Sequence, residues 1–131
     1  MSIEHVVLDA SALIDLVRGR GLSAGVRDRI EGCVLHAPCL LDAEVLSGLG
    51  RLHRSGGLAA EAVAAQLDAV AAAPIERHPL PPLLAAAWAR RHQLRLADAL
   101  YVELADRLQT SVITTDQALG RATDLAEAVV T

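Results

Sequence analysis

Four acidic residues stand at positions where they could share one metal ion. Asp9 ends one short apolar stretch and Asp116 follows another, whereas Glu44 and Asp98 lie near the start of two segments with helical spacing. In an open α/β fold, the carboxyl ends of parallel strands and the amino ends of the following helices share one edge of the sheet. We therefore expect the four carboxylates to converge on one pocket.

Such a set of carboxylates has a limited range of chemistry. Four that meet cannot all remain ionised without a cation. Mg²⁺ and Mn²⁺ prefer oxygen ligands with room for water. A water bound to such an ion is a stronger nucleophile, and one or two ions can hold the attacking and leaving oxygens of a phosphodiester. The pattern thus predicts metal-dependent phosphodiester hydrolysis.

Each acid alone also has a simpler interpretation. Asp9 or Ser11 could merely cap the helix that follows. Asp98 and Asp116 would be favoured by a helix dipole, and Glu44 could be a solvated helix residue. Four such coincidences along one sheet edge are less expected than one shared site.

The rest of the chain predicts the elements that position these acids. Apolar periodicity, interrupted by Gly and Pro, indicates alternating strands and helices. Strands are expected over residues 3–8, 33–37, 75–78, 111–114 and 128–130; helices over 11–18, 22–30, 41–54, 59–72, 81–92, 97–108 and 116–121. Short strands alternating with longer helices are typical of an α/β fold, a short central parallel sheet flanked by helices on both faces. We expect one domain spanning residues 1–131.

Composition limits the classes of protein further. The chain is 53% hydrophobic, has no apolar run near the ~18 residues of a membrane span, and carries Glu4 and His5 where a signal peptide would be basic. A cytoplasmic protein is expected. The net charge of −4 argues against nucleic acid at first, but a metal bound by the acids would reverse the local field.

The basic residues exclude several chemistries. All twelve are Arg, which suits bidentate phosphate contacts, and Lys is absent. The missing Lys excludes a P-loop and Schiff-base catalysis, and it weighs against a receiver-like domain phosphorylated on Asp9. Arg90, Arg91 and Arg95 precede Asp98, where they could guide an RNA backbone or merely end a helix.

The remaining histidines, acids and aromatic residues are not expected to take part in catalysis. The five histidines are spread along the chain and no pair of them is placed at one site, so a metal-free, histidine-based ribonuclease is not indicated. Asp15 is expected to be peripheral, and Asp42 to cap the helix that carries Glu44. Trp88 and Tyr101 are the only aromatic residues, too few for a base-stacking platform.

Four motifs carry a family resemblance. They are V-V-L-D-A-S-A-L, A-P-x-L-x-x-x-E, L-x-x-A-D-A-L-Y and V-I-T-T-D, in this order. Together they resemble the PIN domain, and more specifically the VapC toxins of type II toxin–antitoxin pairs, over essentially the whole chain. The resemblance implies a Mg²⁺-dependent endoribonuclease, with Mn²⁺ as a substitute, that is usually a homodimer and is held silent by a cognate VapB-like antitoxin.

The resemblance also implies roles for individual residues. The family's four acids fall on Asp9, Glu44, Asp98 and Asp116, and its small hydroxyl residues on Ser11 and Thr114. We expect Asp9, Asp98 and Asp116 to hold the metal directly or through water, and Glu44 to orient or deprotonate the attacking water. The hydroxyls would hydrogen-bond the carboxylates or a phosphate oxygen. A non-catalytic RNA- or protein-binding module on the same fold is the alternative, which the intact acid set disfavours.

Overall fold

A computed structural model describes residues 2–130, which form one five-stranded sheet. The strand order is β3-β2-β1-β4-β5, and every neighbouring pair is parallel. The strands are β1 (His5–Leu8), β2 (Val34–Pro38), β3 (Ile75–His78), β4 (Val112–Thr114) and β5 (Ala126–Ala128). The predicted α/β class with a short central parallel sheet is confirmed.

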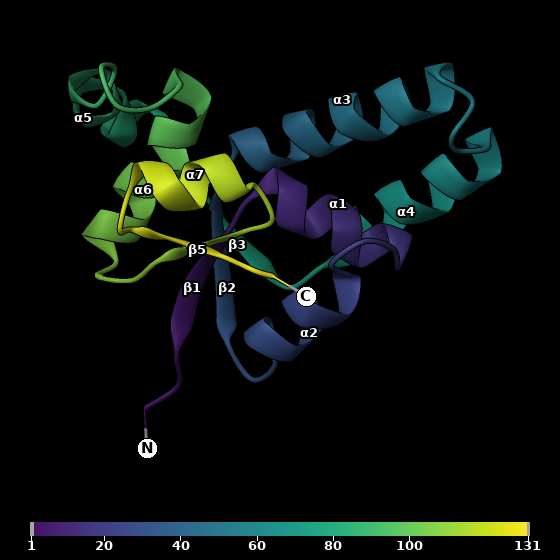
Figure 1. Ribbon diagram of the computed structural model, residues 1–131, viewed down its shortest axis with the longest axis horizontal. Coiled ribbons are helices and arrows are strands. Elements are labelled where there is room, and N and C mark those ends of the chain that lie inside the picture. Colours follow the sequence, from purple (N-terminus) through teal and green to yellow (C-terminus); the bar gives the residue numbers. More distant parts are fainter. Residues whose placement is uncertain (1, 131) are drawn as a thin grey trace.

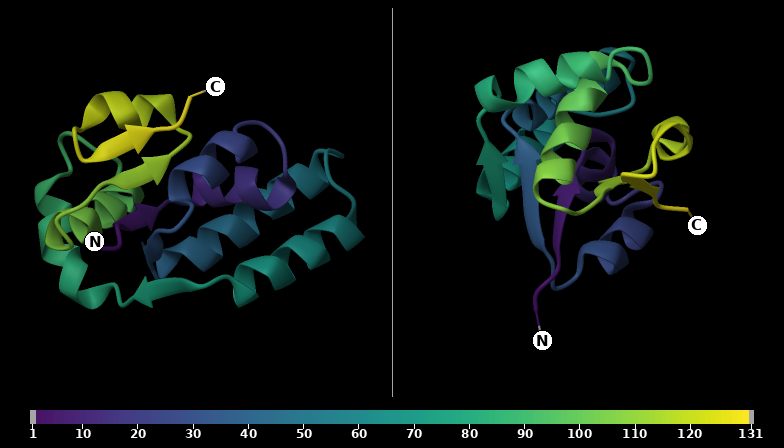
Figure 2. Two further views of the ribbon diagram at one scale, coloured as in Figure 1. Left: turned by 90° about the horizontal axis from the view of Figure 1, so that it is seen from below. Right: turned by 90° about the vertical axis from the view of Figure 1, so that its left-hand side faces the viewer.

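Helices cover both faces of this sheet. They are α1 (Ala10–Arg18), α2 (Ser23–Ile30), α3 (Leu40–Arg54), α4 (Ala60–Ala72), the 3₁₀ turn η1 (Pro81–Leu83), α5 (Leu84–Ala89), α6 (Leu96–Arg107) and α7 (Gln117–Ala122). Figure 1 shows α1 to α4 on one side of β1 and β2, and α5 and α6 on the other. The helices α3 and α4 form a long antiparallel pair that extends away from the sheet (Figures 1 and 2).

The central strands are buried between these two layers. Val6, Val7 and Leu8 of β1 have no exposed surface, and neither do Val112 and Ile113 of β4. Strands covered on both faces are expected to be continuously apolar, as these are, because both side-chain directions enter a core. The acids that follow these two strands therefore start from rigid, fully packed backbone.

The structure differs from the sequence prediction in two segments. The helix predicted over residues 81–92 divides into η1 and the short α5, which ends at Ala89. The sequence predicts the last strand at 128–130, whereas pairing with β4 covers Ala126–Ala128. Within residues 2–130, no helix has the length and apolar character needed to cross a membrane.

Candidate functional site

Asp9 occupies the junction between β1 and α1. Its Oδ1 atom accepts hydrogen bonds from the Ala12 amide at 3.0 Å and from the Ser11 hydroxyl at 2.8 Å. Asp9 therefore caps α1, as the simpler interpretation proposed, and it also lines a pocket. Only 7% of the residue is exposed, and this burial raises the pKa of Asp9 from 3.8 to about 6, with a smaller contribution from the negative charge of Asp98.

Asp116 occupies the corresponding junction between β4 and α7. Its Oδ1 atom caps α7 by accepting from the amides of Ala118 and Leu119 at 2.9 and 3.3 Å. The buried Thr114 hydroxyl accepts from the Asp116 amide at 3.0 Å. Because one carboxylate oxygen caps the helix, the other is free to face the pocket that Asp116 lines.

Two hydroxyl groups connect these junctions. The Ser11 and Thr114 oxygens lie 3.2 Å apart, and the Ser11 oxygen also accepts from the Thr115 amide at 3.1 Å. The Thr114 hydroxyl contributes a hydrogen bond that opposes the rise in the pKa of Asp9. These contacts fix the ends of β1 and β4 relative to each other, and with them Asp9 and Asp116.

Glu44 and Asp98 arrive from α3 and α6. Tyr101, one turn after Asp98, donates its hydroxyl to Glu44 Oε1 at 2.7 Å. Burial raises the pKa of Tyr101 far above its usual range, and the hydrogen bond to Glu44 acts in the same direction. The phenol therefore stays protonated and holds one oxygen of Glu44 in place.

The four acids line one pocket of about 220 Å³. Asp9, Glu44, Asp98 and Asp116 come from four different segments, and Ser11, Ile14, Tyr101 and two arginines complete the lining with Ala10. Asp15 is not among the lining residues; its carboxylate accepts from the Leu22 amide at 3.3 Å. The structure thus brings together the acids that the sequence singled out, while their individual roles stay predictions.

The two arginines of this pocket are Arg51 and Arg95. Arg95 Nε lies 3.2 Å from Asp98 Oδ2, and Arg95 Nη2 lies 3.7 Å from Asp116 Oδ2. Arg51 is not among the residues predicted from the sequence, although it follows Glu44 by seven residues and so shares its face of α3. Both arginines introduce positive charge beside the carboxylates.

The other arginines near Asp98 point elsewhere. Arg90 pairs with Glu103 and Asp106, and Arg91 stacks on Trp88 with its guanidinium 4.7 Å from the ring centre. Of the predicted cluster, Arg95 alone lines the acidic pocket. The three arginines differ in direction because each contacts different side chains in the folded protein, and the local sequence does not show these contacts.

Two further sequence predictions are wrong. Asp42 does not cap α3; it receives two hydrogen bonds from Arg77 of β3, at 2.9 and 3.1 Å, because its side chain faces the neighbouring strand. The histidines are not all separate either. His5, His36 and His78 form a hydrogen-bonded row, since the register of β1, β2 and β3 places them side by side.

The donors of the acidic pocket fit a hard divalent cation. Its four acidic residues offer only carboxylate oxygens, which Mg²⁺ and Mn²⁺ bind in preference to most other ligands. The buried Asp9 carboxylate receives hydrogen bonds from hydroxyls and an amide, and no ion pair to it is found among residues 2–130. Arg95, whose side chain is 80% exposed, is a weak substitute for a cation.

Comparisons with known proteins agree with this arrangement. The PIN domain family matches residues 6–125. Ribonuclease VapC3 of Mycobacterium tuberculosis is 48% identical over 127 residues, covering 96% of this chain and 93% of the relative. Ribonuclease VapC1 of the same organism is 38% identical over 125 residues and 94% of both chains.

Solved structures share the fold at lower identity. PAE2754 from Pyrobaculum aerophilum superimposes with a TM-score of 0.70 at 23% identity, over 95% of this chain and 82% of that one. A toxin–antitoxin complex from Klebsiella pneumoniae gives a TM-score of 0.61 at 20% identity, over 86% and 87%. With the family match spanning nearly the whole chain and relatives well above 30% identity, the chain belongs to the PIN-domain family and is of the VapC type.

Proposed function

We propose that this protein is a Mg²⁺-dependent endoribonuclease and the toxin of a type II toxin–antitoxin pair. The observation that carries the proposal is the convergence of four carboxylates on one pocket at the carboxyl edge of the sheet. The 48% identity to a protein named a ribonuclease supports the reaction class. Because its substrate would be cellular RNA, we also propose that it acts in the cytoplasm.

The carboxylates would divide into metal-binding and water-positioning groups. Asp9, Asp98 and Asp116 would hold Mg²⁺, or Mn²⁺ in its place, directly or through water. The ion would supply positive charge to the scissile phosphate in the transition state. The hydroxyls of Ser11 and Thr114 keep the Asp9 carboxylate oriented toward the pocket.

Glu44 is the candidate for handling the attacking water. Tyr101 engages one of its oxygens, which leaves the other to accept a proton from water. In-line attack of that water on phosphorus would break the bond to the 3′ oxygen. The products would be a 5′-phosphate and a 3′-hydroxyl.

Analysis of the product ends tests the reaction. Purified protein free of antitoxin is incubated with cellular RNA and Mg²⁺, and the new ends are mapped. Fragments that are substrates for a 5′-monophosphate-dependent exonuclease are expected. Ends that carry a 2′,3′-cyclic phosphate would contradict the proposal, because they arise when the RNA's own 2′-hydroxyl attacks. Folded protein that binds RNA without cutting it would favour the binding module.

Arg95 would bind the RNA backbone at the entrance to this pocket. It competes with the metal for Asp98 and Asp116, so Arg95→Ala is expected to weaken RNA binding and to tighten Mg²⁺ binding a few-fold. The slope of RNA affinity against salt concentration should fall by about 1. Arg91→Ala, which removes an exposed arginine stacked on Trp88, is the matched control. Equal effects of both substitutions on Mg²⁺ affinity would exclude this role.

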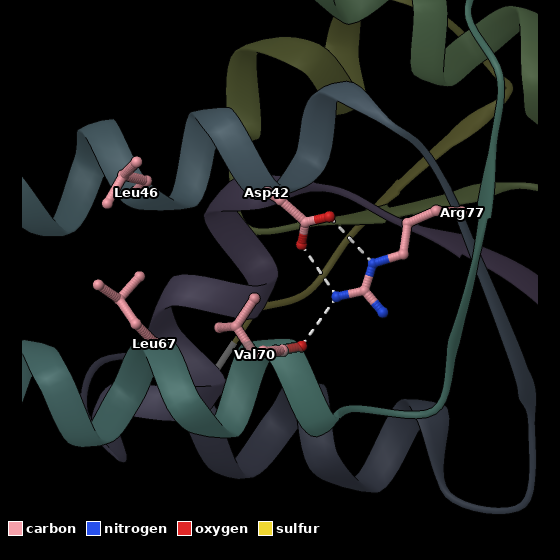
Figure 3. Close-up of a pocket in the computed structure, with 6 residues that line it drawn as sticks. Asp42, Leu46, Leu67, Val70 and Arg77 are labelled. Carbon is pink, nitrogen blue, oxygen red and sulfur yellow. Dashed lines mark hydrogen bonds and ion pairs between the residues drawn. The ribbon is translucent and has the colours of Figure 1, made fainter.

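The groove between α3 and α4 is our candidate for the antitoxin surface. It has a volume of about 510 Å³ and is lined by Leu46, Leu67, Val70 and Ala71, with Asp42 and Arg77 at one end (Figure 3). Arg77 bridges the two helices by contacting Asp42 of α3 and the carbonyl of Val70 in α4. An apolar segment of a VapB-like antitoxin would pack against the exposed Leu46.

A second apolar groove is our candidate for the homodimer interface. It is lined by Leu40, Leu84, Ala87, Trp88, Leu96, Ala97 and Leu100. Three of its large side chains are exposed, among them Trp88 at 57%, and a monomer would leave them in water. This surface lies mostly on α5 and α6, with Leu40 at the start of α3, and it shares no residue with the α3–α4 groove.

Light scattering separates the two surfaces. The wild-type protein alone should have the mass of a dimer, and Trp88→Glu that of a monomer. Leu46→Glu should stay dimeric but fail to bind the antitoxin. A monomeric wild-type protein would refute the dimer, and undiminished antitoxin binding by Leu46→Glu would refute the groove assignment.

A further inference from the structure

Three histidines and one glutamate, His5, His36, His78 and Glu76, lie together on one face of the sheet, outside the acidic pocket. In the parallel register, His36 of β2 lies beside Glu76 of β3, and Pro38 lies beside His78. Because side chains alternate along a strand, Glu76 and His78 share a face. Arg77 lies between them and points the other way, toward α3 and α4.

The ligand atoms of this cluster are close to the spacing that a metal requires. His36 Nδ1 lies 2.9 Å from His78 Nε2 and 3.5 Å from Glu76 Oε2, and the three ligand atoms all fall within 4.8 Å of one another. In a tetrahedral Zn²⁺ site with bonds of about 2.0–2.1 Å, ligand atoms lie roughly 3.3–3.4 Å apart. The two separations from His36 Nδ1 bracket this spacing, and adjustment of the exposed Glu76 and half-buried His78 side chains would bring the third pair of ligand atoms to it.

His5 supplies the outer partner that a metal-binding histidine needs. Its Nδ1 atom lies 2.8 Å from His36 Nε2, and the two rings stack with centres 5.1 Å apart. A histidine that binds metal through one nitrogen usually donates its other N–H to an acceptor, which fixes the ring. His36 can thus use Nδ1 for the metal and donate Nε2–H to His5. His36 is only 4% exposed, and burial lowers its pKa, which favours the neutral form that binds metals.

We propose that His36, Glu76 and His78 bind Zn²⁺ or a similar divalent transition metal, with His5 orienting His36. Two imidazole nitrogens and one carboxylate suit such an ion, whereas the oxygen-only pocket suits Mg²⁺. The two sites share no residue. Glu76 is exposed, so a fourth position is open to water. The ion would tie β2 to the edge strand β3, whose Arg77 holds α3 to α4.

Metal titration of the full-length protein tests this site. Metal-free protein is titrated with Zn²⁺ against a chromophoric chelator, with excess Mg²⁺ present to occupy the acidic pocket. We expect one equivalent to bind, and Co²⁺ in its place to give the strong visible absorption of a tetrahedral site. Removing a ligand by His78→Gln should weaken binding by roughly 100-fold or more, and His5→Gln by about 10- to 100-fold. The exposed Glu76→Gln provides a ligand substitution that leaves the buried His36 in place.

Two control variants make the result decisive. His92→Gln removes an exposed histidine outside the cluster and should leave Zn²⁺ affinity unchanged. Asp98→Asn alters the acidic pocket, and it should also leave Zn²⁺ affinity unchanged. This result would separate the zinc site from the proposed nuclease site. Zn²⁺ binding that persists in both His78→Gln and Glu76→Gln, or that is lost in Asp98→Asn, would overturn the proposal.

Discussion

Replacing Asp9 with Asn is expected to lower metal-dependent RNA cleavage by at least about 100-fold, since even residues that only orient a metal ligand cost 10- to 100-fold. Asn keeps the acceptor oxygen that caps α1 through the Ala12 amide and receives the Ser11 hydroxyl, so the fold is retained. The negative charge that would hold Mg²⁺ is lost. Initial cleavage rates on a fixed RNA, measured across Mg²⁺ concentrations, check this result.

Asp15→Asn is the matched control for that substitution. Asp15 lies on the same helix but outside the pocket, and its hydrogen bond from the Leu22 amide can be kept by an Asn oxygen. Cleavage by this variant should remain within a few-fold of wild type. Equal losses in both variants would point to a general effect of charge on α1 and would contradict the assignment of Asp9.

The second large effect concerns stability without metal. Burial raises the pKa of Asp9 from 3.8 to about 6, so ionising it in the folded protein costs roughly 3 kcal/mol. The folded state binds this proton more tightly than the unfolded state does. The loss of folding stability caused by ionising Asp9 is therefore absent below about pH 4, grows as the pH rises toward 6, and is fully present above 6. Asp9→Asn removes the cost and its pH dependence.

Urea unfolding in EDTA measures this difference. The free energy of unfolding of Asp9→Asn minus that of wild type should increase by about 3 kcal/mol between pH 4 and pH 7. Adding saturating Mg²⁺ at pH 7 should stabilise the wild type and leave the variant unchanged. If the difference in the free energy of unfolding does not vary with pH, then ionised Asp9 does not destabilise the folded state. Such a cost is typical of sites that trade stability for function.

The sequence predicted those parts of the site that follow from local pattern. Apolar strands that end just before Asp9 and at Thr114, and helices that begin near Glu44 and Asp98, are visible in the sequence as periodicity and motif. A parallel sheet then brings their ends to one edge. Arg51 could have been predicted in the same way, because it lies two helical turns after Glu44 on the same face of the helix.

Other features depend on which residues become neighbours in the folded sheet. The row of His5, His36 and His78 arises from the register of three strands that are far apart in the chain, and no local spacing shows it. The pairing of Asp42 with Arg77 likewise requires knowing that β3 lies next to β2. Such contacts are set by tertiary packing, so patterns within a single segment do not predict them.

The most direct test of the acidic pocket as a metal-dependent nuclease site is cleavage of total cellular RNA by purified, antitoxin-free protein. Wild type and Asp98→Asn are compared at equal concentration in Mg²⁺, in Mn²⁺ and in EDTA, with circular dichroism to establish that both are folded. Discrete fragments from the wild type with either metal, absent in EDTA and in the variant, are the predicted result. Undiminished cleavage in EDTA, or by Asp98→Asn, would show that the acidic pocket is not a metal-dependent nuclease site.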